Sequence, residues 1–200
     1  MKPLLDVNDA AYAKRLDRLG RRWWKRLLDV QRPYRWFLRG LQLGYVLDLG
    51  CGVGRSLINS GANGVGVDVN PHAVELARQR GLKAFEPAAF ESSQYARLGA
   101  FDTLLLAHVV EHMTFEQARA LLEHHLRYLR PHGRVVLIAP QQAGFTSDPT
   151  HVTYFDFAKL RALLQSAHVA PIEQRSFPFP QAVGRWFIHN EFVVIGRKQG

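Results

Sequence analysis

The 200-residue sequence contains a single cysteine, Cys51, and no apolar run approaching the roughly 18 residues of a membrane span. One cysteine excludes an intramolecular disulfide and fits a reducing compartment. Charges interrupt the N-terminal stretch every few residues, so we also expect no signal peptide. These absences together predict a cytoplasmic protein.

Acidic residues are scarce in the first 40 positions. This segment holds 11 Lys and Arg against 4 Asp and Glu, whereas the remaining residues hold 15 against 13. Most of the net charge of +9 therefore belongs to the N-terminal segment. Such a segment can attract an acidic substrate, a membrane surface or nucleic acid, or it can simply be a solvated helix face.

Apolar residues recur every three or four positions over residues 8–30, which predicts an amphipathic helix, and a second short helix is expected over residues 34–41. Aromatic residues interleave with arginines here, which favours a lid packed on the domain over a nucleic-acid reader. These aromatic residues are Trp23, Trp24, Tyr34, Trp36 and Phe37. We expect a basic helical cap over residues 1–40 and one compact domain over residues 41–200.

Short apolar runs alternate with helical patterns from residue 45 onward. Helix starts are predicted at Asn70, which precedes a proline, at Thr114, which has Gln117 at capping-box spacing, and at Asp156. A turn at residues 131–133 is expected to end the helix that begins after Thr114. Strands are expected over residues 45–50, 64–69, 82–85, 101–107, 134–140, 172–177 and 191–198. Continuous apolar strands separated by helices are typical of a parallel sheet covered on both faces.

A glycine-rich loop follows the first expected strand, in the segment "YVLDLGCGVGRSL" at residues 45–57. A loop at the carboxyl end of such a strand is where α/β proteins bind ligands. Its glycines follow the pattern G-x-G-x-G, and Arg55 stands where a dinucleotide fingerprint has its third glycine. No Gly-Lys-Ser or Gly-Lys-Thr follows, so a P-loop is also excluded.

Two carboxylates frame this loop. Asp48 stands two residues before the first glycine, and Asp68 ends the second strand, where a carboxylate can accept the hydroxyls of a ribose. A carboxylate beside the loop would repel a pyrophosphate but suits a ligand with an ammonium group. S-adenosylmethionine has an ammonium group, a ribose and no phosphate, so the pattern favours it as the cofactor.

Four segments in order, "VLDLGCGVGRSL", "GVGVDVNPHAVELAR", "FDTLLLAHVVEHM" and "LRPHGRVVLIAPQ", resemble the class I S-adenosylmethionine-dependent methyltransferases. The resemblance covers about residues 33–170 and is closest to the branch whose fourth strand ends in a Glu-His pair, shared with quinone, sugar, lipid and natural-product methyltransferases. It implies an enzyme that transfers the methyl group of S-adenosylmethionine. It also implies an α/β, Rossmann-like, doubly wound sheet of seven strands whose last strand is antiparallel.

The resemblance further implies a cofactor site. Asp48 and the glycine loop would line the methionine end, and Asp68 would bind the ribose. Two pairs of residues would contact adenine, one pair directly after Asp68 and the other in place of an acidic residue that the family often carries after the third strand. The implied residues are Asp48, Gly50, Cys51, Gly52, Gly54, Asp68, Val69, Asn70, Ala89, Phe90, His108 through its backbone, and Tyr34 as a closing residue.

Methyl transfer to a hydroxyl requires alignment of the reactants and removal of a proton, and histidine is the usual base near neutral pH. His151, in the loop after the fifth strand, is the first candidate base, and His112 is the second, with Glu111 beside it. The alternative is that Glu111 and His112 only brace the loop through hydrogen bonds. We expect surface positions for His124, His125, His132 and His168.

His108 and His112 lie four residues apart, a spacing that on a helix would present both side chains to one metal ion. The first lies at a strand end and the pattern is not H-E-x-x-H, so we predict no metal site built by the protein. A magnesium ion held jointly with a vicinal-diol substrate stays an alternative.

The sequence as a whole predicts O-methylation of a small-molecule, sugar or lipid-linked acceptor. The segment "AHVVEH" after the fourth strand lacks the Asn/Asp-Pro-Pro-aromatic motif of base-amino methyltransferases, so no DNA substrate is expected. One alternative is an RNA-directed methyltransferase that uses the basic N-terminal segment. Another is a cofactor-binding regulator without catalysis.

Overall fold

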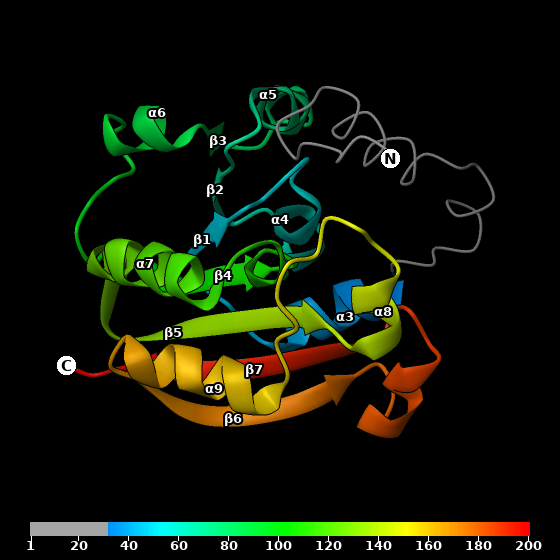
Figure 1. Ribbon diagram of the computed structural model, residues 1–200. Helices are drawn as coiled ribbons and strands as arrows, with labels where there is room; N and C mark the ends of the chain where they lie inside the picture. The colour runs from blue at the N-terminus through cyan, green and yellow to red at the C-terminus, as the bar shows by residue number, and fades with distance from the viewer. Residues whose placement is uncertain (1–31) are drawn as a thin grey trace. The chain divides into compact units, whose positions relative to one another are not determined.

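The computed structural model describes residues 32–200 (Figure 1). These residues belong to two compact units, the first ending at Tyr95 and the second beginning at Ala96. The helix expected over residues 8–30, with Trp23 and Trp24, lies outside the described residues. The division into a cap over residues 1–40 and a domain over residues 41–200 therefore stays a prediction.

Seven strands form the sheet, as the family resemblance implies. In the first unit the order is β3-β2-β1, with parallel pairs; in the second it is β4-β5-β7-β6, with β7 antiparallel to both of its neighbours. The α/β sheet with an antiparallel last strand is thus confirmed. The strands are β1 (Val46–Leu49), β2 (Gly64–Val67), β3 (Ala84–Phe85), β4 (Phe101–Ala107), β5 (Leu129–Pro140), β6 (Val169–Phe177) and β7 (Glu191–Lys198).

In the first unit, all residues of the two short strands β1 and β2 are buried. Helix α4 (Arg55–Ser60) follows the glycine loop. Helix α5 (Pro71–Gln79) begins at the predicted cap, where the Asn70 side chain accepts hydrogen bonds from the N–H groups of His72 and Ala73 at 3.0 and 3.1 Å. The helices of this unit are α3 (Arg32–Gly40), α4 (Arg55–Ser60), α5 (Pro71–Gln79) and α6 (Pro87–Glu91).

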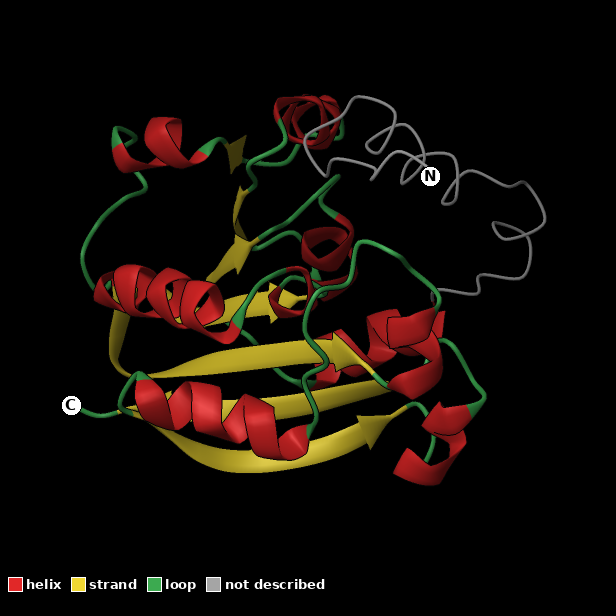
Figure 2. Cartoon of the chain, viewed as in Figure 1, coloured by secondary structure: helices red, strands yellow, loops and turns green. Residues whose placement is uncertain are grey.

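The second unit carries two longer helices, α7 (Phe115–His125) and α9 (Phe157–Ser166), which lie side by side on the same face of its strands (Figure 2). Both predicted caps are confirmed: Thr114 and Gln117 form a capping box, and the Asp156 side chain accepts from the N–H of Lys159. The shorter elements are α8 (Gln142–Thr146), η1 (Val110–His112), η2 (Leu126–Tyr128) and η3 (Gln181–Arg185). None of the helices within residues 32–200 combines the length and the hydrophobicity that a membrane span requires.

Two expectations for the end of α7 are wrong. The helix ends at His125, and the expected turn at residues 131–133 lies inside β5, where a register shift leaves extra residues opposite β4. His125 is buried, not at the surface. Burial is compatible with its polarity because the ring Nδ1 lies 2.8 Å from the carbonyl oxygen of Leu121, one helical turn earlier.

Gly64 in β2 provides a test of the packing between β1 and β2. A Cβ at this position would overlap the carbonyl oxygen of Val46 in the neighbouring strand. Replacing Gly64 by Ala should therefore lower the free energy of unfolding in urea by about 1–3 kcal/mol.

Gly40 is the matched control, because a Cβ added at this end of α3 meets no atom within 4 Å. Alanine there should leave stability unchanged or raise it slightly. Equal stability of the Gly64→Ala protein and the wild type would contradict this description of the β1–β2 pair.

Candidate functional site

The glycine loop of the first unit has a left-handed backbone at each predicted glycine. The φ angles of Gly50, Gly52 and Gly54 are 71°, 52° and 79°, a region that residues with a Cβ rarely adopt. The N–H groups of Gly50 and Cys51 donate to the carbonyl oxygen of Val67 at 2.7 and 3.1 Å. The loop is therefore folded back onto the end of β2.

Asp68 connects this loop to the start of α5. Its Oδ2 accepts from the N–H of Gly52 at 2.7 Å, and its Oδ1 accepts from the N–H of Asn70 at 2.8 Å. Burial raises the pKa of Asp68, and these two backbone hydrogen bonds partly offset the rise. Each carboxylate oxygen keeps a second acceptor position, so the side chain can still bind two hydroxyl groups.

Asp48 is more deeply buried, with 1% of its surface exposed. Burial, reinforced by the charge of Asp68, raises the pKa of Asp48 well above its ordinary value. Among the described residues, no group forms a hydrogen bond with its Oδ2. A buried carboxylate oxygen without a partner is costly, so this position favours a ligand that brings a positive charge or donors.

The neighbouring residues divide into those that shape the site and those that can touch a ligand. Asn70 is 2% exposed and caps α5, so its side chain positions the backbone. Val69 is 61% exposed and presents apolar surface directly after Asp68. Cys51 is a buried free thiol whose pKa is raised well above the ordinary value, by burial first and then by the two aspartates, so it stays protonated.

The residues expected after β3 are only partly available to a ligand. Ala89 is exposed, but Phe90 is fully buried, so its ring has no surface left to offer to adenine. This corrects the expectation for Phe90. Tyr34 is half-buried in α3, the helix that packs against α4 directly after the glycine loop.

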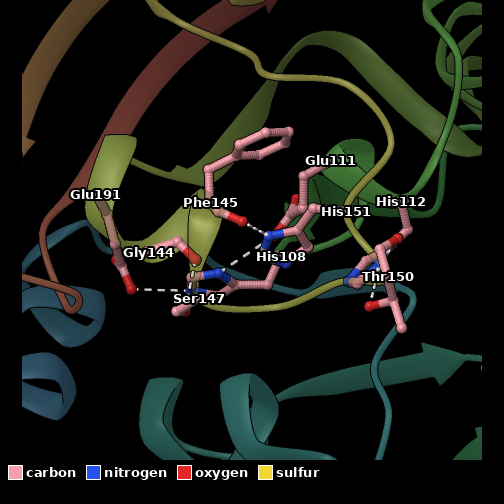
Figure 3. A network of polar contacts seen from close by, with 9 residues as sticks. All are labelled: His108, Glu111, His112, Gly144, Phe145, Ser147, Thr150, His151 and Glu191. Atoms are coloured by element: carbon pink, nitrogen blue, oxygen red, sulfur yellow. Dashed lines mark hydrogen bonds and ion pairs between the residues drawn. The ribbon is translucent and has the colours of Figure 1, made fainter. Parts of the chain in front are cut away.

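In the second unit, the side chain of His108 is held between two glutamates (Figure 3). Its Nε2 lies 2.8 Å from Oε1 of Glu191, and its Nδ1 lies 3.4 Å from Oε1 of Glu111. Burial alone would lower the pKa of His108, but the two carboxylates outweigh it and raise the pKa from 6.5 to about 10. The role of His108 thus includes a side-chain ion pair that the sequence did not indicate.

Glu191 was missed by sequence reasoning. It begins β7, 83 residues after His108, and no local spacing connects the two positions. The one signal in the sequence is an acidic residue at the start of an apolar strand.

The three candidate catalytic residues come together in the second unit. Glu111 and His112 belong to η1 after β4, and His151 belongs to the loop after α8 (Figure 3). The rings of the two histidines have centroids 4.9 Å apart. The carbonyl oxygen of Glu111 accepts from the N–H groups of Val152 and Thr153 at 2.7 and 3.1 Å, which ties the loop to η1.

The hydrogen bonds assign the neutral tautomer of both histidines. Nδ1 of His151 lies 2.7 Å from the carbonyl oxygen of Phe145, which can only accept. Nδ1 of His112 lies 3.2 Å from both oxygens of Thr150, whose hydroxyl already donates to Asp148. Nδ1 is therefore the donor in each neutral ring, and Nε2 keeps its lone pair.

Part of the chain is similar in sequence to known methyltransferases. Residues 47–137 match the family model described as Methyltransferase domain, a span that includes the glycine loop, Asp68 and η1. The tRNA (carboxymethyluridine(34)-5-O)-methyltransferase alkbh8 of Xenopus tropicalis is 35% identical over 104 residues. These are 50% of this chain and 16% of that protein, so the chain spans a small part of the relative's length.

Two solved structures share the fold over nearly the whole chain. A SAM dependent methyltransferase from Archaeoglobus fulgidus has a TM-score of 0.66 and 18% identity, covering 95% of this chain and 100% of that chain. Magnesium protoporphyrin IX methyltransferase from Synechocystis PCC 6803, with bound SAH, has a TM-score of 0.64 and 19% identity, covering 96% of both chains. Residues 47–137 thus match a methyltransferase domain, and the fold is that of S-adenosylmethionine-dependent methyltransferases.

Solved structures with this fold include methyltransferases with bound S-adenosylhomocysteine, which supports S-adenosylmethionine as the cofactor. The residues of the first unit fit it: the buried Asp48 oxygen without a partner suits the ammonium group, and the acceptor positions of Asp68 suit the ribose. The assignment to the Glu-His branch stays a prediction.

Replacement of Asp48 by Asn separates stability from binding. The pKa of Asp48 is raised in the folded state, so ionisation of this carboxyl destabilises the ligand-free protein. The destabilisation sets in as the pH rises from the ordinary pKa of aspartate through the raised pKa of Asp48. The Asn variant should therefore equal or exceed the wild type in melting temperature at neutral pH. It should also bind S-adenosylmethionine about tenfold more weakly or worse by calorimetry.

Glu75→Gln, an exposed carboxylate on α5, is the control and should leave both quantities unchanged. A lower melting temperature of the Asp48→Asn protein with unchanged affinity would refute this role for Asp48.

Proposed function

We propose that the protein transfers a methyl group from S-adenosylmethionine to an oxygen of a small-molecule, sugar or lipid-linked acceptor. The bound sulfonium supplies an activated methyl carbon. The observation that carries the proposal is that one ring nitrogen each of His112 and His151 and one carboxylate oxygen of the buried Glu111 lie within 4.8 Å of one another, while Nδ1 of both rings faces a carbonyl oxygen. A histidine ring nitrogen with a free lone pair suits removal of a hydroxyl proton.

The proton is taken up by His151 in this proposal. Its Nδ1–H bond to the Phe145 carbonyl orients the ring and leaves Nε2 as the acceptor. Transfer to the acceptor oxygen would break the carbon–sulfur bond of the sulfonium, and Nε2 of His151 would receive the hydroxyl proton. The carboxylate of Glu111 lies close enough to stabilise the positive charge that develops on the ring.

His112 is the second candidate base. Its ring is held in the same tautomer through the carbonyl oxygen of Thr150, so its Nε2 is equally able to accept a proton. We assign it the supporting role because His151 has the shorter orienting hydrogen bond, 2.7 Å against 3.2 Å.

An RNA acceptor is the second candidate function. It is favoured by the 35% identity to alkbh8, whose name is that of a tRNA methyltransferase, and by the basic composition of residues 1–40. The basic segment is equally suited to an acidic small substrate or a membrane surface. A DNA acceptor is not part of either proposal, and a cytoplasmic location stays a prediction.

Turnover of labelled S-adenosylmethionine in the presence of acceptor extracts tests the assignment of the base. His151→Ala should lower kcat by about 10²–10⁴-fold, and His112→Ala should have a smaller effect. His124→Ala, which removes an exposed imidazole from α7, should be unaffected. Unchanged turnover in the His151→Ala enzyme would overturn its role as the base, and cofactor binding without any turnover would indicate a regulator.

A gel-shift titration separates the two acceptor classes. Binding to an RNA acceptor should weaken steeply as salt rises, because phosphate contacts release counterions. If added RNA produces no gel shift at low salt, the RNA alternative is excluded and the small-molecule, sugar or lipid-linked acceptor remains.

A further inference from the structure

We propose that Glu111, His112 and His151 bind one divalent transition-metal ion. Each of the three residues offers one ligand atom, and these atoms lie within 4.8 Å of one another. Sequence reasoning considered only His108 and His112 and predicted no such site. In the structure His112 is grouped with Glu111 and His151 instead of His108. The Nε2 of His108 is in contact with the carboxylate of Glu191.

The spacing requires only a small contraction. Ligand atoms at about 2.1 Å from a tetrahedral ion are about 3.4 Å apart. Starting from separations of at most 4.8 Å, adjustments of about an ångström by each side chain reach this geometry. Both histidines are half-buried, on η1 and on the loop after α8, so their rings have room to make this adjustment.

The hydrogen bonds around both histidines suit metal ligands. A metal-binding histidine normally donates its other ring N–H to a carbonyl or carboxylate, which fixes its tautomer. Here Nδ1 of His112 and of His151 each face a backbone carbonyl oxygen, that of Thr150 and that of Phe145. Two Nε2 lone pairs therefore remain for an ion.

Glu111 supplies a second, independent observation. Its side chain is 1% exposed, and among the described residues neither of its carboxylate oxygens has a hydrogen-bond partner. Nδ1 of His108 lies 3.4 Å from Oε1 of Glu111, but the same ring is shared with Glu191, whose Oε1 lies 2.8 Å from Nε2. Within residues 32–200 the buried carboxylate oxygens of Glu111 therefore have no hydrogen-bond partner, and a coordinated cation would compensate for this.

The ligand set indicates the class of ion. Two imidazoles and one carboxylate suit zinc, manganese, iron or cobalt, whereas magnesium and calcium prefer oxygen ligands alone. Three protein ligands leave at least one position open for a water molecule or another oxygen.

The use of this open position rests on the proposed function, although the existence of the site does not. An acceptor hydroxyl that coordinates the ion would be acidified, and its proton would pass to solvent water. In the loaded protein His151 is then a ligand, and it acts as the base only when the ion is absent.

The experiment uses the untagged full chain, stripped with a chelator and dialysed into metal-free buffer, because a histidine tag would itself bind metal. Titration with Zn²⁺ and with Mn²⁺ by calorimetry should give one ion per chain for at least one of these metals. Binding of Co²⁺ should produce the visible absorption bands that are typical of an ion in a coordination site of low symmetry. Glu111→Gln and His151→Ala should each weaken binding at least tenfold.

Two exposed positions on α7 are the controls: His124→Ala and Glu123→Gln should bind as the wild type does. Circular dichroism establishes that each variant is folded; if His151→Ala does not fold, the isosteric Glu111→Gln protein decides. Absence of stoichiometric binding to the wild type would overturn the proposal. So would unchanged binding in both ligand variants, or binding that disappears only in His124→Ala.

The result is distinguishable from a failure of the proposed function. Turnover that requires His151 and is unaffected by chelation, with no metal bound, contradicts the metal site and leaves the methyl transfer intact. Metal bound through these three residues supports the site even when no acceptor becomes methylated.

Discussion

Two hydrogen bonds from backbone N–H groups to Asp68 are the contacts on which the first unit's site depends. They join Gly52 in the loop to Asn70 at the start of α5, so one carboxylate positions two segments 18 residues apart in sequence. The left-handed glycines allow the loop to turn back far enough for this contact. The same side chain retains acceptor positions that suit the hydroxyl groups of a ribose, so one residue can serve both the fold and a ligand.

Both units hold a buried carboxylate that the protein itself does not fully satisfy. Asp48 in the first unit and Glu111 in the second each have an oxygen without a hydrogen-bond partner among the described residues. Proteins tolerate such costs mainly where a ligand compensates for them. In the first unit the ammonium of S-adenosylmethionine would compensate; in the second, a metal ion or the protonated ring of His151 would serve.

Local patterns predicted much of this structure, and long-range contacts account for most of what they missed. The caps at Asn70, Thr114 and Asp156 and the glycine loop depend on residues within a few positions of one another, so their spacing could be read directly. Glu191 could not be assigned to His108, because 83 residues separate them. His125 was misplaced because its polarity suggested the surface, whereas a hydrogen bond within its own helix permits burial. The helices α6 and α8 have five residues each, too few for a periodic pattern.

The central claim is that the paired aspartates and the glycine loop recognise a phosphate-free adenosyl sulfonium. Calorimetric titration of the wild type and of Asp68→Asn with S-adenosylmethionine, NAD and ATP tests it most directly. The account predicts one S-adenosylmethionine site per chain, strong weakening in the variant, and no comparable binding of the two phosphate-bearing ligands. Tighter binding of NAD or ATP, or an affinity for S-adenosylmethionine that does not change with Asp68, would contradict it.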